Sequence, residues 1–225
     1  MLTATEKQFT ILFLIIVFLE LVTSSSLSLT YTHYIAKPAI VASLIFLFVK
    51  TFHSRSYIRF FTITALIFAL IGDILLMFVH IWEHYFTLGL VAFLLAHVMY
   101  ILVFLKQRNS KISPFRCIVI LFLYAMVLFY YLHTGLGDML IPVVIYMLVI
   151  LTMATTAFLR KEKVNTVSFK LVFTGSIFFM LSDSILALDK FYKPMPFSNI
   201  SIIITYAIAQ YLIVLGIIKS KCNNT

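Results

Sequence analysis

Two aspartates lie inside long apolar stretches of the chain, where charged side chains are rare. Asp73 follows the run ALIFALIG, and Asp183 stands in the similar run IFFMLSDSILAL. A charged side chain at membrane depth costs at least about 3 kcal/mol unless it is paired or neutralised. Two carboxyls that share a low-dielectric site do not readily both ionise, so one keeps its proton near neutral pH. Such a pair can donate and accept protons, which is the chemistry of general acid–base catalysis.

The surroundings of the two aspartates are related by a shift of 110 residues. At that shift their neighbours also match, in the pairs Ile67 and Ile177, Phe68 and Phe178, and Leu76 and Leu186. At a shift of 113, the LAH that ends at His97 falls on the IAQ that ends at Gln210. Chance similarity between apolar segments is a competing explanation. The order of the features predicts a parallel four-plus-four repeat, with halves of about 1–110 and 111–225.

The elements that must position these residues are membrane-spanning helices. The chain has 225 residues, of which 63% are hydrophobic and 11% charged, and a soluble core of this size cannot bury so much apolar surface. Apolar runs of about 20 residues recur without alternation, which favours helices over a barrel. The runs cover 8–27, 35–52, 58–79, 84–105, 115–133, 138–159, 168–189 and 198–219. We therefore predict an all-α polytopic membrane bundle of eight transmembrane helices, forming one domain over 1–225.

Basic residues gather in the connections on one side of the predicted bundle. That side holds both termini and 14 of the 17 Lys and Arg residues, and leaves Lys37, Lys190 and Lys193 on the other. The positive-inside rule therefore places both termini in the cytoplasm, with the protein in the cell membrane if the chain is bacterial. The same distribution accounts for the net charge of +9 without nucleic acid as a partner, because no basic soluble module is present.

A third acid, Glu20, is expected at the depth of the two aspartates. Asp73 and Asp183 lie about two thirds along outward-running spans, roughly 5 Å beyond the midplane, and Glu20 reaches a similar depth. We expect three acids at one depth to converge on an interior cavity. The structural alternative is that each carboxyl is only hydrogen-bonded to a neighbouring helix.

Further polar side chains that could take part in a site lie in three other spans. His97 lies near mid-membrane with Tyr100 almost one turn later, and Tyr206 and Gln210 share one face of the last span. These groups fit either satisfied hydrogen bonds between helices or a supporting and proton-transfer role. Lys37, at the outer end of the second span, fits either a snorkelling anchor or a partner for an acid or a lipid phosphate.

The segment HIWEH at 80–84 matches the H-x-x-E-H pattern of a zinc-protease class. That chemistry needs both histidines on one helix and a third ligand. Here the five residues bridge two spans, so we interpret them as an interfacial turn anchored by Trp82 and expect no metal site.

An ordered set of short motifs supports a family resemblance over essentially the full chain. The motifs are Lys37-Pro38, Gly72-Asp73, Ala96-His97-x-x-Tyr100, Ser182-Asp183-x-x-Leu186-Ala187 and Tyr206-x-x-Ala209-Gln210. In this order they resemble the YhhN family, the lysoplasmalogenases. The resemblance implies hydrolysis of the vinyl ether bond of a lysoplasmalogen to a fatty aldehyde and a glycerophospho-head group. Lysophospholipid substrate and membrane lipids would be the partners, and no cofactor is implied.

The two aspartates suit this implied reaction. A vinyl ether is cleaved when an acid protonates its β-carbon, and a second carboxylate would stabilise the cation and orient water. Asp73 is interpreted as the acid because Gly72 and its apolar neighbours solvate it little, while Ser182 and Ser184 flank Asp183 and would support its anion. A proton-coupled transporter and a non-catalytic membrane subunit are the alternatives from other classes.

Overall fold

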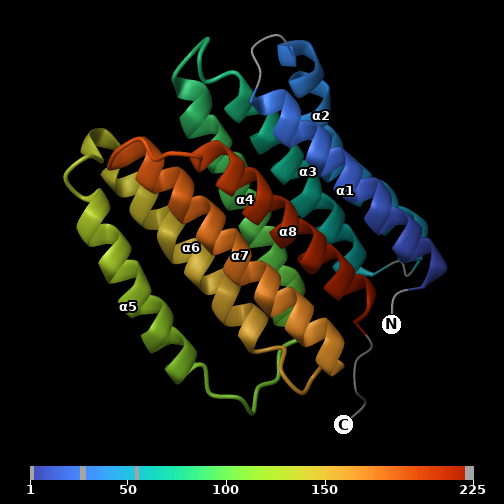
Figure 1. Ribbon diagram of the computed structural model, residues 1–225. Coiled ribbons are helices and arrows are strands. Elements are labelled where there is room, and N and C mark those ends of the chain that lie inside the picture. Colours follow the sequence, from blue (N-terminus) through green and yellow to red (C-terminus); the bar gives the residue numbers. More distant parts are fainter. Residues whose placement is uncertain (1–2, 26–28, 54–55, 221–225) are drawn as a thin grey trace.

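Long helices pack side by side in the computed structural model (Figure 1), which describes residues 3–25, 29–53 and 56–220. Among these residues, eight helices are long and apolar enough to cross a membrane, which confirms the predicted all-α class. They are α1 (Ala4–Ser24), α2 (Thr30–Thr51), α3 (Tyr57–Met77), α4 (His84–Lys106), α5 (Phe115–Leu132), α6 (Leu140–Phe158), α7 (Thr166–Phe191) and α8 (Ser198–Ile218). A short 3-10 helix, η2 (Gly137–Met139), precedes α6.

The first two helices depart most from the predicted spans. α1 begins at Ala4 rather than 8 because a capping box forms there, in which Thr3 and Glu6 exchange backbone-to-side-chain hydrogen bonds of 2.7 and 3.2 Å. α2 begins at Thr30 rather than 35, so Lys37 lies two turns inside the helix and not at its end. Hydropathy marks the apolar part of a helix, whereas hydrogen bonds decide where it begins. The predicted span end at 27 and the basic residues Arg55 and Lys221 lie outside the described residues.

The pairs α3–α4 and α7–α8 pack most extensively. A Cβ atom on Gly72 would lie 2.7 Å from the ring of Phe93, and one on Gly216 would lie 2.6 Å from the Val172 side chain, so both glycines allow close approach. On one side α2 contacts α1, α3 and α8, and on the other α6 contacts α5, α7 and α4. The α2–α8 and α4–α6 contacts correspond between the two halves, and the four-plus-four repeat stays a prediction.

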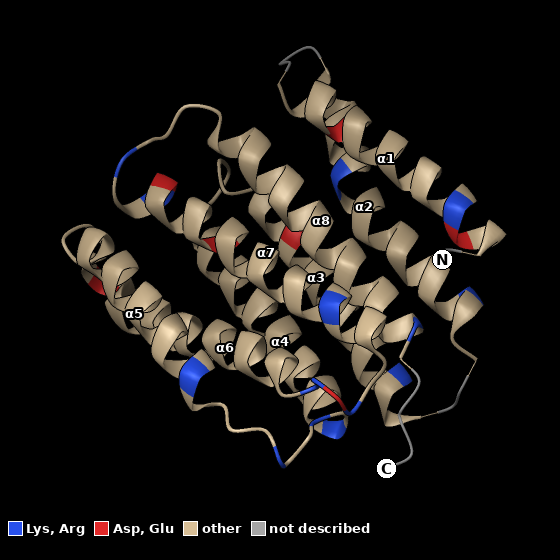
Figure 2. Cartoon of the chain, turned by 60° about the horizontal axis from the view of Figure 1, so that its bottom comes forward, with Lys and Arg blue, Asp and Glu red and all other residues tan. Residues whose placement is uncertain are grey.

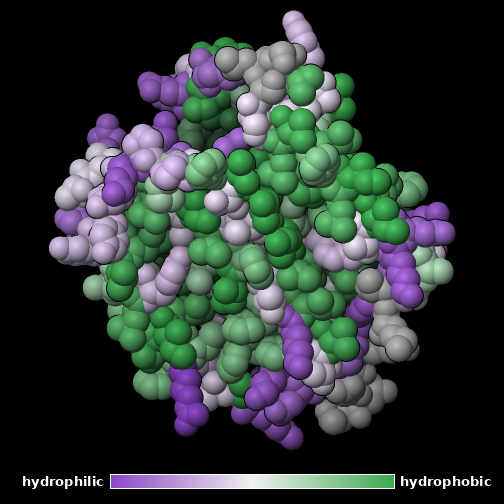
Figure 3. Space-filling model, in the orientation of Figure 1, coloured by the Kyte–Doolittle hydropathy of each residue, from purple (hydrophilic) through white to green (hydrophobic). Residues whose placement is uncertain are grey.

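Both described ends of the chain lie at one end of the bundle, called here the terminal end, and the opposite end is called the far end (Figure 1). Figure 2 shows most Lys and Arg residues at the terminal end, with some acidic residues in the interior of the bundle and others at its ends. Apolar side chains cover the middle of the face shown in Figure 3, and hydrophilic ones gather at its edges. An apolar band between polar ends is typical of helices that span a membrane.

Candidate active site

Asp73 of α3 and Asp183 of α7 line one cavity of about 280 Å³. The cavity lies toward the far end, where Lys190 and Asn199 also line it and are exposed. Asp73 is 2% exposed and the Asp183 side chain 16%. The two carboxyls are close enough for their charges to interact electrostatically. The structure therefore brings the two predicted acids together in a buried site with access to the far end.

Each carboxyl accepts a hydrogen bond from one tyrosine. Tyr206 of α8 donates from Oη to Asp73 Oδ2 at 2.8 Å, and Tyr146 of α6 donates from Oη to Asp183 Oδ2 at 2.6 Å. A phenol O–H can donate to a carboxyl in either protonation state. The two bonds thus orient the carboxyls without deciding which of them carries a proton.

Tyr146 was not among the residues predicted from the sequence, which favoured two serines beside Asp183. Ser182 Oγ instead donates to the backbone oxygen of Ile202 at 3.2 Å, although Ser182 also lines the cavity. Ser184 Oγ donates to the backbone oxygen of Met180 at 2.7 Å. The signal that would have found Tyr146 is a tyrosine in the middle of an apolar run, away from the interfacial ends of the span.

Three of the predicted polar residues form one chain of hydrogen bonds that ends at Asp73. Tyr100 Oη donates to Gln210 Oε1 at 2.7 Å, and Gln210 Nε2 donates to Tyr206 Oη at the longer distance of 3.4 Å. Tyr100 and Gln210 are fully buried. These hydrogen bonds connect α4 and α8 to α3. The bond from Gln210 helps to hold the Tyr206 hydroxyl in position to donate to Asp73.

His97 of α4 lies beside Asp183 but is not bonded to it. Its Nε2 is 3.8 Å from Asp183 Oδ2, which exceeds a hydrogen-bond distance. The ring is fully buried, edge-to-face with Phe179 at 4.5 Å and with Tyr146 at 5.4 Å, and neither ring nitrogen has a hydrogen-bond partner. A buried polar atom without a hydrogen-bond partner costs free energy of folding, so it calls for an explanation. Here the unpaired nitrogens of His97 lie next to the Asp183 carboxyl, which lines a cavity.

The remaining predicted residues divide between the cavity and its surroundings. Lys37 lines the cavity and interacts electrostatically with both Asp73 and Glu20. Glu20 is fully buried, with Oε2 3.1 Å from His33 Nδ1. In the described part of the chain, Glu20 is not among the residues that line the cavity. Lys37 therefore stands between the aspartate site and the third acid.

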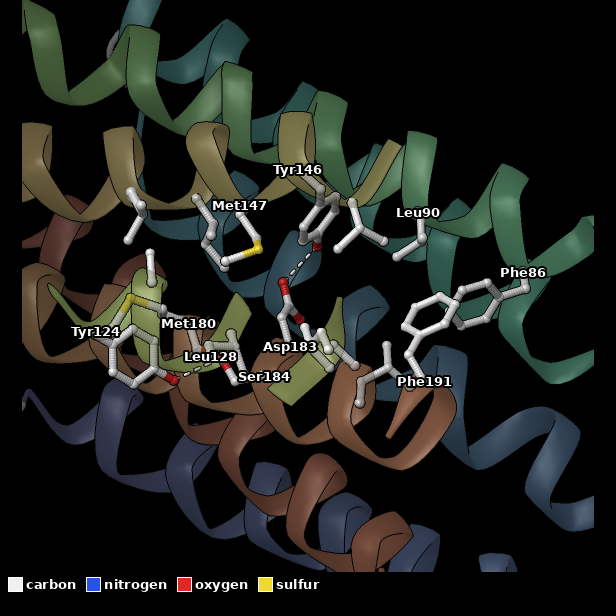
Figure 4. A pocket seen from close by; sticks show the side chains of 17 residues that line it. Phe86, Leu90, Tyr124, Leu128, Tyr146, Met147, Met180, Asp183, Ser184 and Phe191 are labelled. Carbon is white, nitrogen blue, oxygen red and sulfur yellow. Dashed lines mark hydrogen bonds between the residues drawn. The ribbon is translucent and has the colours of Figure 1, made fainter. Parts of the chain in front are cut away.

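A second, smaller cavity of about 50 Å³ adjoins the first, and we call it the apolar slot. Figure 4 shows that Asp183 and Tyr146 meet at its centre, with Tyr124 and Met180 toward one end and Phe86 and Phe191 toward the other. The slot runs between α4, α5, α6 and α7. It shares three lining residues with the larger cavity: Asp183, Phe86 and Leu186.

The HIWEH segment forms the connection between α3 and α4. His80 lies in the turn after α3, Trp82 is exposed, and His84 is the first residue of α4. The two histidines therefore do not share one helix face. Over residues 3–25, 29–53 and 56–220, no group of three or more His, Cys, Asp or Glu side chains could hold a metal ion.

These features define a class: a multi-pass helical membrane protein with a pair of buried carboxyls in a cavity between its helices. The model of the YhhN family matches residues 32–217. The chain belongs to the YhhN family, as its ordered motifs predicted.

Curated relatives carry the name lysoplasmalogenase. Human lysoplasmalogenase TMEM86B is 30% identical over 161 residues, which make up 72% of this chain and 65% of the human protein. Bovine lysoplasmalogenase TMEM86A is 30% identical over 163 residues, or 69% of this chain and 64% of the bovine protein. The chain thus spans a little under two thirds of the lengths of these relatives. No solved structure matches the chain significantly.

Proposed function

We propose that this protein is an integral membrane hydrolase that cleaves the vinyl ether bond of lysoplasmalogen-type lysophospholipids. The products would be a fatty aldehyde and a glycerophospho-head group. The observation that carries the proposal is the pair Asp73 and Asp183, buried in one cavity of a chain whose relatives are named lysoplasmalogenases. Membrane lipids surround the apolar helices, and lysophospholipid would enter from them.

The proposed reaction starts with proton transfer from one carboxyl to carbon. Protonated Asp73 gives its proton to the β-carbon of the vinyl ether, which leaves an oxocarbenium ion. Ionised Asp183 stabilises this cation and accepts a proton from the water that attacks the carbon bonded to oxygen. Asp73 is assigned the acid role because it is the more buried of the two, 2% exposed against 16% for the Asp183 side chain.

The hemiacetal formed by water attack then collapses. The bond between the hemiacetal carbon and the glycerol oxygen breaks, the glycerol oxygen takes a proton from Asp183, and the hemiacetal hydroxyl returns a proton to Asp73. One water is consumed and both carboxyls regain their starting protonation states. His97, whose ring nitrogens have no hydrogen-bond partner, lies 3.8 Å from Asp183 Oδ2 and would move a proton to or from this carboxyl.

The far-end part of the cavity would hold the head group. Lys37 and Lys190 line it and carry the charge that suits a phosphate, while Asp189 lines the same cavity and suits the ammonium of ethanolamine or choline. We further propose that Glu20 positions Lys37 through the electrostatic interaction between the two side chains.

The decisive experiment is an assay of the purified protein with lysoplasmalogen in detergent or liposomes. We expect stoichiometric release of fatty aldehyde and glycerophospho-head group, with no release from the saturated ether analogue, which lacks the double bond to protonate. Intact protein without aldehyde release would overturn the proposal, and proton-driven flux across liposomes would then favour a transporter.

We also propose that both termini lie in the cytoplasm, on the side that holds 14 of the 17 basic residues. In a bacterial cell the protein would then lie in the cytoplasmic membrane, with the aspartate cavity in its outer half. A reporter fused after residue 225 is expected to be active only in the cytoplasm. An externally active fusion would reverse the assignment.

A further inference from the structure

The apolar slot is the feature of the molecule that the proposed acid–base chemistry leaves unused. Its polar side chains are bonded to one another: Tyr124 Oη donates to Ser184 Oγ at 2.8 Å, and Tyr146 Oη donates to Asp183 Oδ2 at 2.6 Å. The rest of the lining is aliphatic or aromatic. Away from Asp183, walls of this kind favour hydrocarbon over a charged head group.

The lining of the slot extends along α5. Tyr124 and Leu132, both in the lining, are eight residues apart on α5, which corresponds to about 12 Å along the helix. The slot has a volume of about 50 Å³ against about 280 Å³ for the polar cavity, so it is the smaller of the two. It meets the polar cavity at Asp183. A molecule that filled both would be polar at one end and a single hydrocarbon chain at the other.

The slot lies directly behind a helix that faces the membrane. α5 packs mainly on α6 and α7 at the edge of the bundle, and its residues Leu123 and Val127 are each 61% exposed (Figure 1). Buried α5 residues hold this helix against the bundle, Leu132 in the slot lining toward the far end and Leu121 toward the terminal end. One helix therefore separates the slot from surrounding lipid.

We propose that the apolar slot is a separate subsite for the hydrocarbon chain of the substrate, and that Ala125 of α5 limits the chain that it admits. The identity of the substrate rests on the function proposed above. With the chain in the slot and the head group beside Lys37 and Lys190, the bond that joins them lies at Asp183. This arrangement gives a physical reason why Asp183 lines both cavities while Asp73 lines only the polar one.

Photo-crosslinking tests the subsite without requiring turnover. The probe is a lysophospholipid with a saturated ether-linked chain that carries a diazirine at mid-chain, so vinyl ether hydrolysis cannot consume it. We expect adducts on Leu128 and Met147, which line the slot, and their loss when unlabelled lysophospholipid is added in excess. Adducts confined to lipid-facing residues such as Val127, or insensitive to competition, would overturn the proposal.

Variants with a larger side chain at Ala125, which lines the slot, are compared with a variant at the lipid-facing Val127. Ala125→Phe is expected to reduce competed labelling of Met147 at least tenfold, whereas Val127→Phe, on the lipid-facing side of α5, should leave it unchanged. Ala125→Leu is a smaller substitution that keeps the test valid if the phenylalanine prevents folding, and it should reduce labelling in the same direction. Unchanged labelling in a folded Ala125 variant would overturn the role of this residue.

Kinetics separate this inference from the proposed function. Ala125→Leu is expected to raise KM for a long-chain lysoplasmalogen at least fivefold while changing KM for a four-carbon alkenyl analogue less than twofold. Equal effects on both substrates would count against the slot. If the wild-type protein releases no aldehyde but shows competed labelling, the slot stands as a lysolipid site and the hydrolase proposal fails.

Discussion

Two buried polar regions of this bundle differ in how completely their polar atoms are paired. At the terminal end, Arg160 is fully buried, and its Nε, Nη1 and Nη2 atoms each donate to a protein oxygen of Gln107 or Ser168. Toward the far end, Asp73 and Asp183 each accept one tyrosine hydroxyl beside an open cavity, and His97 has no hydrogen-bond partner.

The difference separates a structural network from a site. Around Arg160 the hydrogen bonds continue through Ser168 Oγ to the backbone oxygen of Gly216 at 2.6 Å, and through Gln107 Nε2 to Ser220 Oγ at 3.0 Å. These contacts tie α4, the α6–α7 connection, α7 and α8 together with protein atoms alone. The aspartate site retains space and polar atoms that water or substrate can use. Burial of a charge is common to both regions, so burial alone does not identify function.

The largest expected effect is the loss of turnover when either aspartate is replaced. Asp73→Asn and Asp183→Asn should each lower aldehyde release about 10³-fold, because the amide cannot transfer the proton or carry the charge. The variants should keep near-normal thermal unfolding in detergent, since an amide of the same size can keep the tyrosine bond. Asp138→Asn, at an exposed position in η2, is the matched control. Near-normal turnover in both variants would refute the paired-acid mechanism.

The next largest effect is expected from replacing Arg160. In contrast to the aspartate variants, this change should lower the stability of the fold and leave turnover intact. Arg160→Met should lower the free energy of unfolding by roughly 3 kcal/mol, since Gln107 and Ser168 would keep buried oxygens without their donor. Arg160→Lys should recover little, because one ammonium cannot reach acceptors placed for a guanidinium. Turnover per folded molecule should stay near wild type. An Arg160→Met protein with unchanged thermal unfolding would show that the network does not support the fold.

A smaller effect is expected when the tyrosine donors are removed. Tyr146→Phe should lower kcat about tenfold, because a hydrogen bond to the ionised Asp183 contributes about 1.5 kcal/mol or more. Tyr206→Phe should lower kcat by a smaller factor, because the Tyr206 hydroxyl donates to the protonated, neutral Asp73. Tyr130→Phe, on the exposed face of α5, is the control. Steady-state aldehyde release measures the effect. An unchanged kcat in both variants would mean that the carboxyls are oriented by other contacts.

The smallest effect concerns the ion pair that joins the two ends of the chain. Lys219 Nζ lies 2.9 Å from Glu6 Oε2, and the Lys219 side chain of this pair is partly exposed whereas that of Glu6 is buried. Glu6→Gln should lower the free energy of unfolding by about 1 kcal/mol or less, as for partly exposed pairs. The shift should shrink in high salt, unlike the effect of Arg160→Met. If Glu6→Gln lowered the free energy of unfolding as much as Arg160→Met, the prediction would be wrong and the ion pair would be a major contribution to stability.

The sequence predicted the helices well because each apolar run has the length that a helix needs to cross a membrane. It predicted Asp73 and Asp183 as site residues because an acid is conspicuous in such a run. It could not predict that Tyr146 bonds Asp183, or that Arg160 is buried rather than a charge at the membrane surface. Partners of this kind depend on how each helix is rotated about its axis, and a helix that is apolar all round carries little pattern to show its inner face.

The junction of the apolar slot with the polar cavity has a consequence for what happens after bond cleavage. A fatty aldehyde released in the slot borders the bilayer across α5, whereas a glycerophospho alcohol released in the cavity borders the aqueous phase beside Lys190 and Asn199. The two products would therefore partition into different phases in opposite directions. Under the proposed function, the reverse reaction would require both products to return to the same site at once, so their separation would slow recombination at the site without changing the equilibrium of hydrolysis.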